Sequence, residues 1–79
     1  MDVKERVVRV LSKRFNVSQI SIKMTDDLIN DFGADSIDMT ELVLDIAEEF
    51  GIFLGREDMA EVKTAGDLVK KIENIRRNR

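Results

Sequence analysis

The chain has 79 residues and contains no Cys, His, Pro, Trp or Tyr. Without Cys it forms no disulfide and no thiolate metal site, and any thioester chemistry needs a thiol from outside the chain. His is the side chain whose charge ordinarily changes near neutral pH. Its absence leaves only strongly shifted carboxylates or lysines as general acids or bases, and such shifts are uncommon in small cores. The composition therefore argues against an enzyme.

Long apolar runs are also missing. No run approaches the roughly 20 residues that a membrane span requires, and the amino end, MDVKER, lacks the apolar segment of a signal peptide. With 43% apolar and 37% charged residues, the composition is typical of a soluble globular domain. The sequence predicts one domain over residues 1–79, located in the cytoplasm or, after processing, in an organelle.

Basic residues are absent from one long stretch. Between Met24 and Gly55 the chain has nine acidic residues and no Lys or Arg, so this stretch carries −9 and the remainder +6. Several of these acids fall three or four positions apart in a predicted helix, where each like-charge pair costs on the order of 0.2–0.5 kcal/mol. A solvated surface usually mixes charges of both signs. The pattern predicts a face for a basic protein partner, with a solvated face as the alternative, and no nucleic-acid partner is expected.

Apolar residues recur at helical spacing in three segments, which predicts three main helices. The first begins after Asp2 and runs to about Phe15, and the last begins at a Thr64–Asp67 capping box. A short helix is expected over residues 57–61, with Met59 and Ala60 facing inward. The expected apolar faces of the first and last helices are Val3, Val7, Val10, Leu11 and Phe15, and Ala65, Leu68, Val69, Ile72 and Ile75.

Residues 16–33 predict a long loop whose apolar side chains fill the helical core: Val17, Ile20, Ile22, Met24, Leu28, Ile29 and Phe32. The basic side chains of the first helix are expected to be solvated and paired with Asp2 and Glu5; they are Lys4, Arg6, Arg9, Lys13 and Arg14. Contact with an anionic partner is the alternative. The basic tail, residues 76–79, is expected to be a frayed, solubilising end.

The central helix is predicted over residues 36–50. A Gly33 turn leads to Asp35, which stands at the N-cap position, with Asp38 as its capping-box partner. Ser36 follows at the first helical position, where its hydroxyl is exposed and the backbone N–H groups are unpaired. The positive end of the helix dipole favours a negative group, such as a phosphodiester, attached there. Taken alone, however, a serine at a helix start is most often simply solvated.

Exposed residues of the same helix predict a docking surface. Ile37 and Leu44 share a stripe with Glu41 and Glu48, and Asp45 lies beside it, giving an apolar pair rimmed by acids. No metal site is expected, because residues 26–37 do not follow the ligand spacing of an EF-hand loop. A weak surface cation site near the acids stays open. The chain has no P-loop, dinucleotide-binding glycine pattern or hydrolase serine elbow.

The segment DFGADSID, together with the later ELV and EEF, resembles the modification motif of the acyl carrier protein family, and the resemblance extends over nearly the whole chain. It implies that Ser36 receives 4′-phosphopantetheine from coenzyme A through a phosphopantetheinyl transferase, with Asp35 and Asp38 beside the attachment point. The thiol of the arm would carry acyl chains. The helix after the serine would dock on basic patches of fatty acid synthase enzymes.

The expected fold is therefore all-α: a small four-helix bundle with a long first loop and one short helix. We expect a monomeric carrier that performs no chemistry itself and presents acyl intermediates to fatty acid synthesis. A carrier for a polyketide, lipid or aminoacyl pathway, or an unmodified docking subunit, are the alternatives. Phe32, Ile37, Gly55 and Ala65 depart from the usual family residues, which leaves the partners open.

Overall fold

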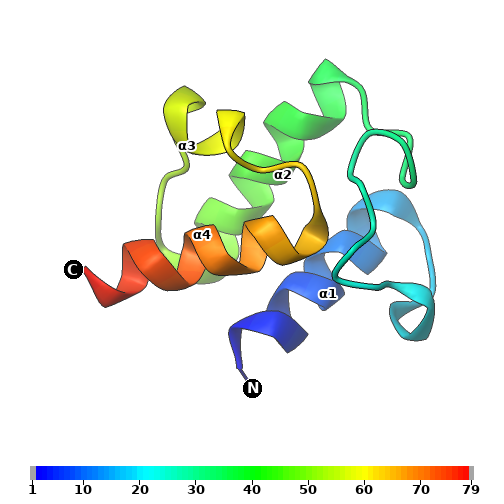
Figure 1. Ribbon diagram of the computed structural model, residues 1–79, viewed down its shortest axis with the longest axis horizontal. Helices are drawn as coiled ribbons and strands as arrows, with labels where there is room; N and C mark the ends of the chain where they lie inside the picture. Colours follow the sequence, from blue (N-terminus) through cyan, green and yellow to red (C-terminus); the bar gives the residue numbers. More distant parts are fainter. Residues whose placement is uncertain (1, 79) are drawn as a thin grey trace.

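The computed structural model describes residues 2–78, and over this range it is built of helices and connecting loops (Figure 1). The elements are α1 (Val3–Phe15), the short 3₁₀-helix η1 (Gln19–Ser21), α2 (Ser36–Phe50), α3 (Arg56–Ala60) and α4 (Ala65–Arg77). The predicted all-α class, with one short helix and a long first loop, is confirmed. The η1 turn was not predicted. Arg79, the last residue of the basic tail, lies outside the described residues.

The three long helices begin at the predicted caps. Asp2, Asp35 and Thr64 each accept a hydrogen bond from the backbone N–H three residues ahead. Such caps satisfy donors that the first turn of a helix leaves unpaired. At the other end of α2, Gly51 adopts a left-handed conformation with φ of 67°, which glycine takes without steric cost. Local sequence thus sets both ends of the central helix.

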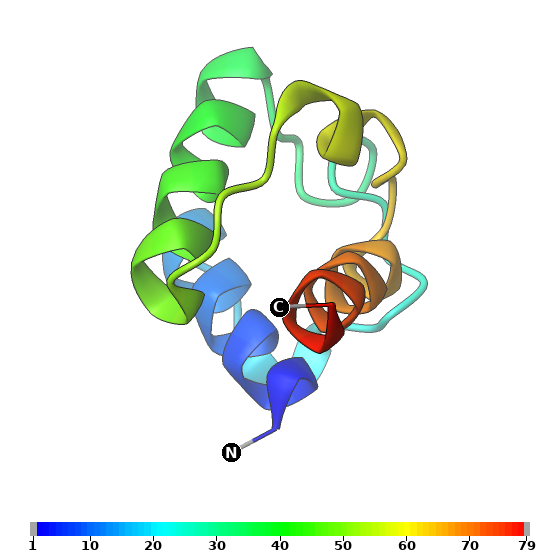
Figure 2. The same cartoon turned by 90° about the vertical axis from the view of Figure 1, so that its left-hand side faces the viewer.

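The core forms where α1 packs against both α2 and α4. Figure 2 shows α4 end-on, with α1 beneath it and α2 to one side. The loops also contribute side chains: Leu28 from the long loop and Leu54 from the α2–α3 connection are almost fully buried. The other side chains with essentially no exposure are Val7, Leu11, Leu42, Ile46, Ala65, Leu68 and Ile72.

The long loop is fastened to the beginning of α4 by backbone hydrogen bonds. The N–H of Leu28 donates to the carbonyl of Lys63 at 2.9 Å, and the N–H of Ala65 donates to the carbonyl of Asp26 at 3.0 Å. An isolated β-bridge between Asp27 and Thr64 lies within the same contact. The loop therefore has a fixed path although it has little regular structure.

Some predictions about individual side chains were wrong. Ile20 and Ile29 were expected to fill the core, but they are 95% and 62% exposed. Ile20 lies in η1, and none of the residues of this single turn is buried. Ala60, expected to face inward, is exposed at the end of α3, whereas Met59 packs partly against the core.

The pairing predicted for the basic side of α1 was also wrong for two arginines. Arg6 donates from Nε to the Glu49 carboxylate at 2.8 Å and from Nη2 to the Glu49 carbonyl at 2.5 Å. Its guanidinium also lies 4.3 Å from the centroid of the Phe50 ring. Arg14 reaches α2 in the same way. These two cations hold α1 against α2 rather than pairing with Asp2 and Glu5, because both project toward the neighbouring helix.

Candidate functional site

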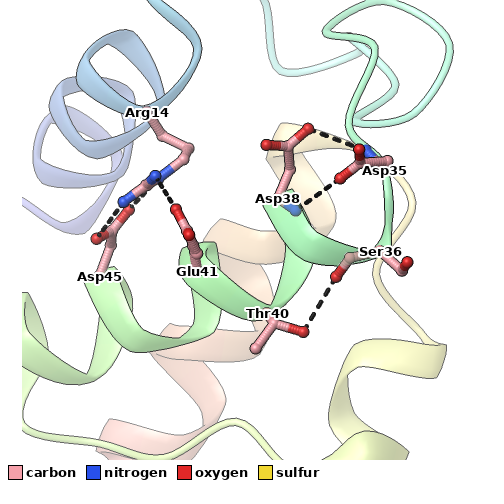
Figure 3. Close-up of polar contacts among 7 residues, drawn as sticks. All are labelled: Arg14, Asp35, Ser36, Asp38, Thr40, Glu41 and Asp45. Atoms are coloured by element: carbon pink, nitrogen blue, oxygen red, sulfur yellow. Dashed lines mark hydrogen bonds and ion pairs between the residues drawn. The ribbon is translucent and has the colours of Figure 1, made fainter.

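The first turn of α2 is closed by a reciprocal capping box (Figure 3). Asp35 Oδ1 accepts from the N–H of Asp38 at 2.9 Å, and Asp38 Oδ2 accepts from the N–H of Asp35 at 3.1 Å. The N–H of Met39 donates to the Asp35 carbonyl at 3.0 Å. Both carboxylates are therefore used to hold the beginning of the helix in one conformation.

Ser36 is exposed at the first position of α2. Its carbonyl oxygen accepts from Thr40 Oγ1 at 3.0 Å, and its hydroxyl points away from the Asp38 carboxylate (Figure 3). Among the described residues, the backbone N–H groups of Ser36 and Ile37 have no acceptor. Two unpaired donors at the positive end of a helix favour a negative group on the adjacent hydroxyl. The site thus suits a phosphodiester on Ser36.

The turn before this site is anchored to the rest of the loop. Gly33 has a φ of 71°, in the left-handed region, and no atom lies within 4 Å of the position that a Cβ atom would occupy. The next residue, Ala34, is buried, and its N–H donates to the Leu28 carbonyl at 3.1 Å. Since Leu28 is itself in the core, the segment that presents Ser36 is fixed on its amino-terminal side as well.

Comparison with known proteins identifies the family of the chain. The family model described as the phosphopantetheine attachment site matches residues 5–72, from the first turn of α1 into α4. The chain belongs to this family. It is thus a phosphopantetheine carrier protein, and both the predicted resemblance and the predicted covalent cofactor are confirmed. Carrier domains of this kind generally bind acyl chains and interact with a phosphopantetheinyl transferase, and generally they are not catalysts themselves.

In this carrier protein four of the five predicted docking residues are exposed on α2. Ile37 and Leu44 are 67% and 60% exposed. Glu41 and Glu48 are exposed on the same stripe, while Asp45 is half-buried on the side toward α1. The structure therefore brings these five residues onto neighbouring stripes of one helix. Their role in binding a partner remains a prediction.

Most acids of the acidic stretch, residues 24–55, have partners within the protein. Glu48 alone among its nine acids makes no hydrogen bond or ion pair with residues 2–78. Three of the others pair with arginines of α1: Glu41, Asp45 and Glu49. The remaining five accept hydrogen bonds from backbone N–H groups: Asp26, Asp27, Asp31, Asp35 and Asp38. Most of these acidic residues thus have a structural role in turns, helix caps or the contact between α1 and α2. The prediction of a basic partner therefore depends mainly on the exposed acids of α2, Glu41 and Glu48.

Arg14 makes the most extensive of these ion pairs (Figure 3). Its Nε and Nη2 donate to the two carboxylate oxygens of Asp45 at 2.7 and 3.0 Å, and its Nη1 contacts the Glu41 carboxylate. The hydrogen bond to Asp45 raises the pKa of Arg14 above its ordinary value. The sequence contained one signal of this contact: Arg14 follows the buried Val7 and Leu11 at positions i+7 and i+3, on the stripe of α1 that faces the core.

A small surface pocket of about 240 Å³ opens next to the first turn of α2. Met39, three residues after Ser36, lines it together with Leu28 and Val62. The rest of its wall comes from Asp27, Ile29, Asn30 and Lys63. The pocket thus combines an apolar interior with a charged rim, close to the predicted attachment residue in the chain.

Residues 2–78 contain neither a cluster of metal ligands nor a membrane span. No three acidic side chains in this range gather closely enough to hold a metal ion. No helix of the described chain is long and apolar enough to cross a membrane.

Proposed function

We propose that Ser36 bears the phosphopantetheine arm and that the protein presents acyl intermediates to enzymes of fatty acid synthesis. The observation that carries the proposal is the exposed Ser36 hydroxyl at a capped helix start whose first two N–H groups have no acceptor. When attached, the arm supplies the thiol that a chain without Cys lacks. The Gly-Ala-Asp-Ser form of the motif, residues 33–36, supports fatty acid synthesis as the pathway.

In this proposal Asp35 and Asp38 act by position rather than by contact with the arm. Their carboxylates accept each other's backbone N–H groups, which keeps the first turn closed and the Ser36 hydroxyl outside it. Because Asp38 lies on the far side of the helix from Ser36, its charge is directed away from the phosphodiester (Figure 3). The helix start therefore presents donors to the phosphodiester while its own acids face elsewhere.

The exposed stripe of α2 is proposed as the surface that meets the transferase and the synthase enzymes. Ile37 and Leu44 supply apolar area, and Glu48 supplies a carboxylate that makes no ion pair with the described residues. Basic patches on partner enzymes would complement this charge and raise the rate of encounter. An acyl chain on the arm would enter the pocket lined by Leu28, Met39 and Val62, which removes its methylene groups from water.

The proposal is tested by intact-mass analysis after incubation with coenzyme A and a broad-specificity phosphopantetheinyl transferase. Wild-type protein and a Ser21→Ala control, altered at another exposed serine, should each gain the mass of a single arm. Ser36→Ala should gain none. An arm on the Ser36→Ala protein would show that the attachment residue lies elsewhere.

Co-expression with candidate synthases distinguishes the pathways. The intact mass then reports which acyl, polyketide or aminoacyl group the arm carries. A protein that never acquires the arm with any transferase would support the remaining alternative, an unmodified docking subunit.

A further inference from the structure

We propose that Arg14 is an internal competitor for basic partners and thereby determines which of them bind the exposed face of α2. This inference rests on the proposed function of that face as a docking surface. It concerns how strongly partners associate with the protein and not whether Ser36 is modified.

The geometry of the ion pair supports competition. Arg14 donates hydrogen bonds to both oxygens of the Asp45 carboxylate, at 2.7 and 3.0 Å, and its third guanidinium nitrogen contacts Glu41. A guanidinium bound to a carboxylate through two parallel hydrogen bonds is the arrangement that a partner's own arginine would adopt. A partner therefore reaches Asp45 only by displacing Arg14.

The competition is stronger at Asp45 than at Glu41, because the Asp45 ion pair is more buried. The side chains of Arg14 and Asp45 are 26% and 29% exposed, whereas that of Glu41 is 48% exposed. Partly buried charges are less screened by salt than fully exposed ones. Asp45 is thus held more firmly than Glu41, and the acids on the α1 side of the docking surface are partly neutralised before any partner arrives.

Glu48 lines the same surface pocket between α1 and α2 as Arg14 and Asp45, but it has no such internal partner among residues 2–78. Glu48 is exposed, and Ile37 and Leu44 are exposed on the same stripe of α2. Arg14 therefore divides the face into an engaged flank, Glu41 and Asp45, and an available strip, Ile37, Leu44 and Glu48. Partners that need only the available strip are favoured over partners that need all of the acids.

Arg14 makes no hydrogen bond or ion pair with Ser36 or with the capping box around it. Its partners on α2, Glu41 and Asp45, lie five and nine positions after Ser36, about 7 and 13 Å along the helix axis, and both project well away from Ser36 around it. Removal of Arg14 should consequently alter the association of the transferase, measured by KM, and leave kcat unchanged.

The test compares Arg14→Gln with Arg9→Gln in transferase kinetics at saturating coenzyme A, at low and at physiological ionic strength. Both substitutions remove one positive charge from α1, but Arg9 is exposed and makes no ion pair with the described residues. Arg14→Gln should lower the KM for the carrier protein about threefold to tenfold at low salt, which corresponds to roughly 0.6–1.4 kcal/mol. Arg9→Gln should change KM less than about twofold, as expected for a charge without local contacts.

A third variant, Arg14→Lys, keeps the positive charge but lacks the planar guanidinium that bonds both oxygens of Asp45. Its KM should lie between those of wild type and Arg14→Gln. It also preserves the test if Arg14→Gln fails to fold, which circular dichroism would reveal. Equal KM changes in Arg14→Gln and Arg9→Gln would mean that only net charge matters, and a higher KM in Arg14→Gln would mean that Arg14 aligns the acids for binding. Either result overturns the inference while Ser36 is still modified, whereas a wild-type protein that accepts no arm contradicts the proposed function as well.

Discussion

The backbone N–H of Gly66 donates a 2.8 Å hydrogen bond to the carbonyl oxygen of Met24. A Cβ atom at Gly66 would lie 3.0 Å from that oxygen and 3.4 Å from Met24 Cβ. The close approach of two backbone segments thus favours glycine here, because a larger residue would have to push the Met24 backbone aside. This contact fastens the long loop, which leads to Ser36, onto the first turn of α4.

Replacement of Gly66 by alanine should destabilise the protein. In an exposed helix interior the same change usually stabilises by about 1 kcal/mol, but here the Met24 carbonyl must move to admit the new methyl group. We expect the free energy of unfolding to fall by about 1 kcal/mol and the melting temperature by about 4–8 °C, as is usual for a domain of this size. Asn74→Ala, at an exposed position of α4, is the control and should raise stability slightly. A higher melting temperature for Gly66→Ala would contradict the close contact.

Stability at low pH should depend on Asp67. Hydrogen bonds from the N–H groups of Lys63 and Thr64, at 3.0 and 3.1 Å, lower the pKa of this carboxyl. A carboxyl whose pKa is lower in the folded state stabilises the fold above its unfolded pKa, about 3.9, and this stabilisation is lost as pH falls through the folded value. Asp67→Asn should therefore have a lower melting temperature than wild type at pH 7. On acidification from pH 6 to pH 2, the melting temperature of Asp67→Asn should fall by less than that of wild type.

Melting curves across this pH range check the expectation. Glu73→Gln removes the same charge from an exposed site on α4 and serves as the charge-matched control. If the Glu73→Gln profile flattens as much as that of Asp67→Asn, the two hydrogen bonds are not the cause.

Attached acyl chains should stabilise the protein in proportion to their length. A medium-length chain in the pocket beside Met39 buries methylene groups, each worth roughly 0.8 kcal/mol when fully removed from water. Loading such a chain should raise the melting temperature above that of the protein with the bare arm. Met39→Phe should reduce the gain by filling the pocket, whereas Ile20→Phe, at a fully exposed site, should not. A melting temperature independent of chain length would place the chain in solvent.

Glu48 should contribute more to partner binding than any acid on α4. Glu48→Lys reverses a charge that is unpaired in the described structure and next to Leu44, so the transferase KM should rise several-fold at low salt and less at high salt. Glu73→Lys, an equal charge reversal at an exposed site on α4, should have a much smaller effect. Glu61 is unsuitable as the control because its carboxylate pairs with Lys71. Equal effects of the two reversals, or no dependence on salt, would remove the case for a docking surface on α2.

The amino-acid sequence by itself determined where the three long helices begin and that Ser36 stands at the first position of α2. The capping boxes at Asp35 and Thr64 join residues three positions apart, so both partners are visible in a short segment of sequence. The left-handed glycine that ends α2 follows from local backbone sterics. The motif that predicts the attachment residue is likewise local, since residues 31–38 are consecutive in the chain.

Only the tertiary structure decided which acids are available to a partner. Arg14 and Asp45 lie 31 residues apart in the chain, and Arg6 and Glu49 lie 43 apart. Whether such residues meet depends on how α1 packs against α2, and a pattern of charges along the sequence carries no information about that packing. The exposure of Ile20 and Ile29 is a second example, because a loop's apolar residues have no regular period that assigns them to the core. Local hydrogen bonds therefore made the capped start of α2 predictable, while contacts between distant helices determined the charge of the surface around it.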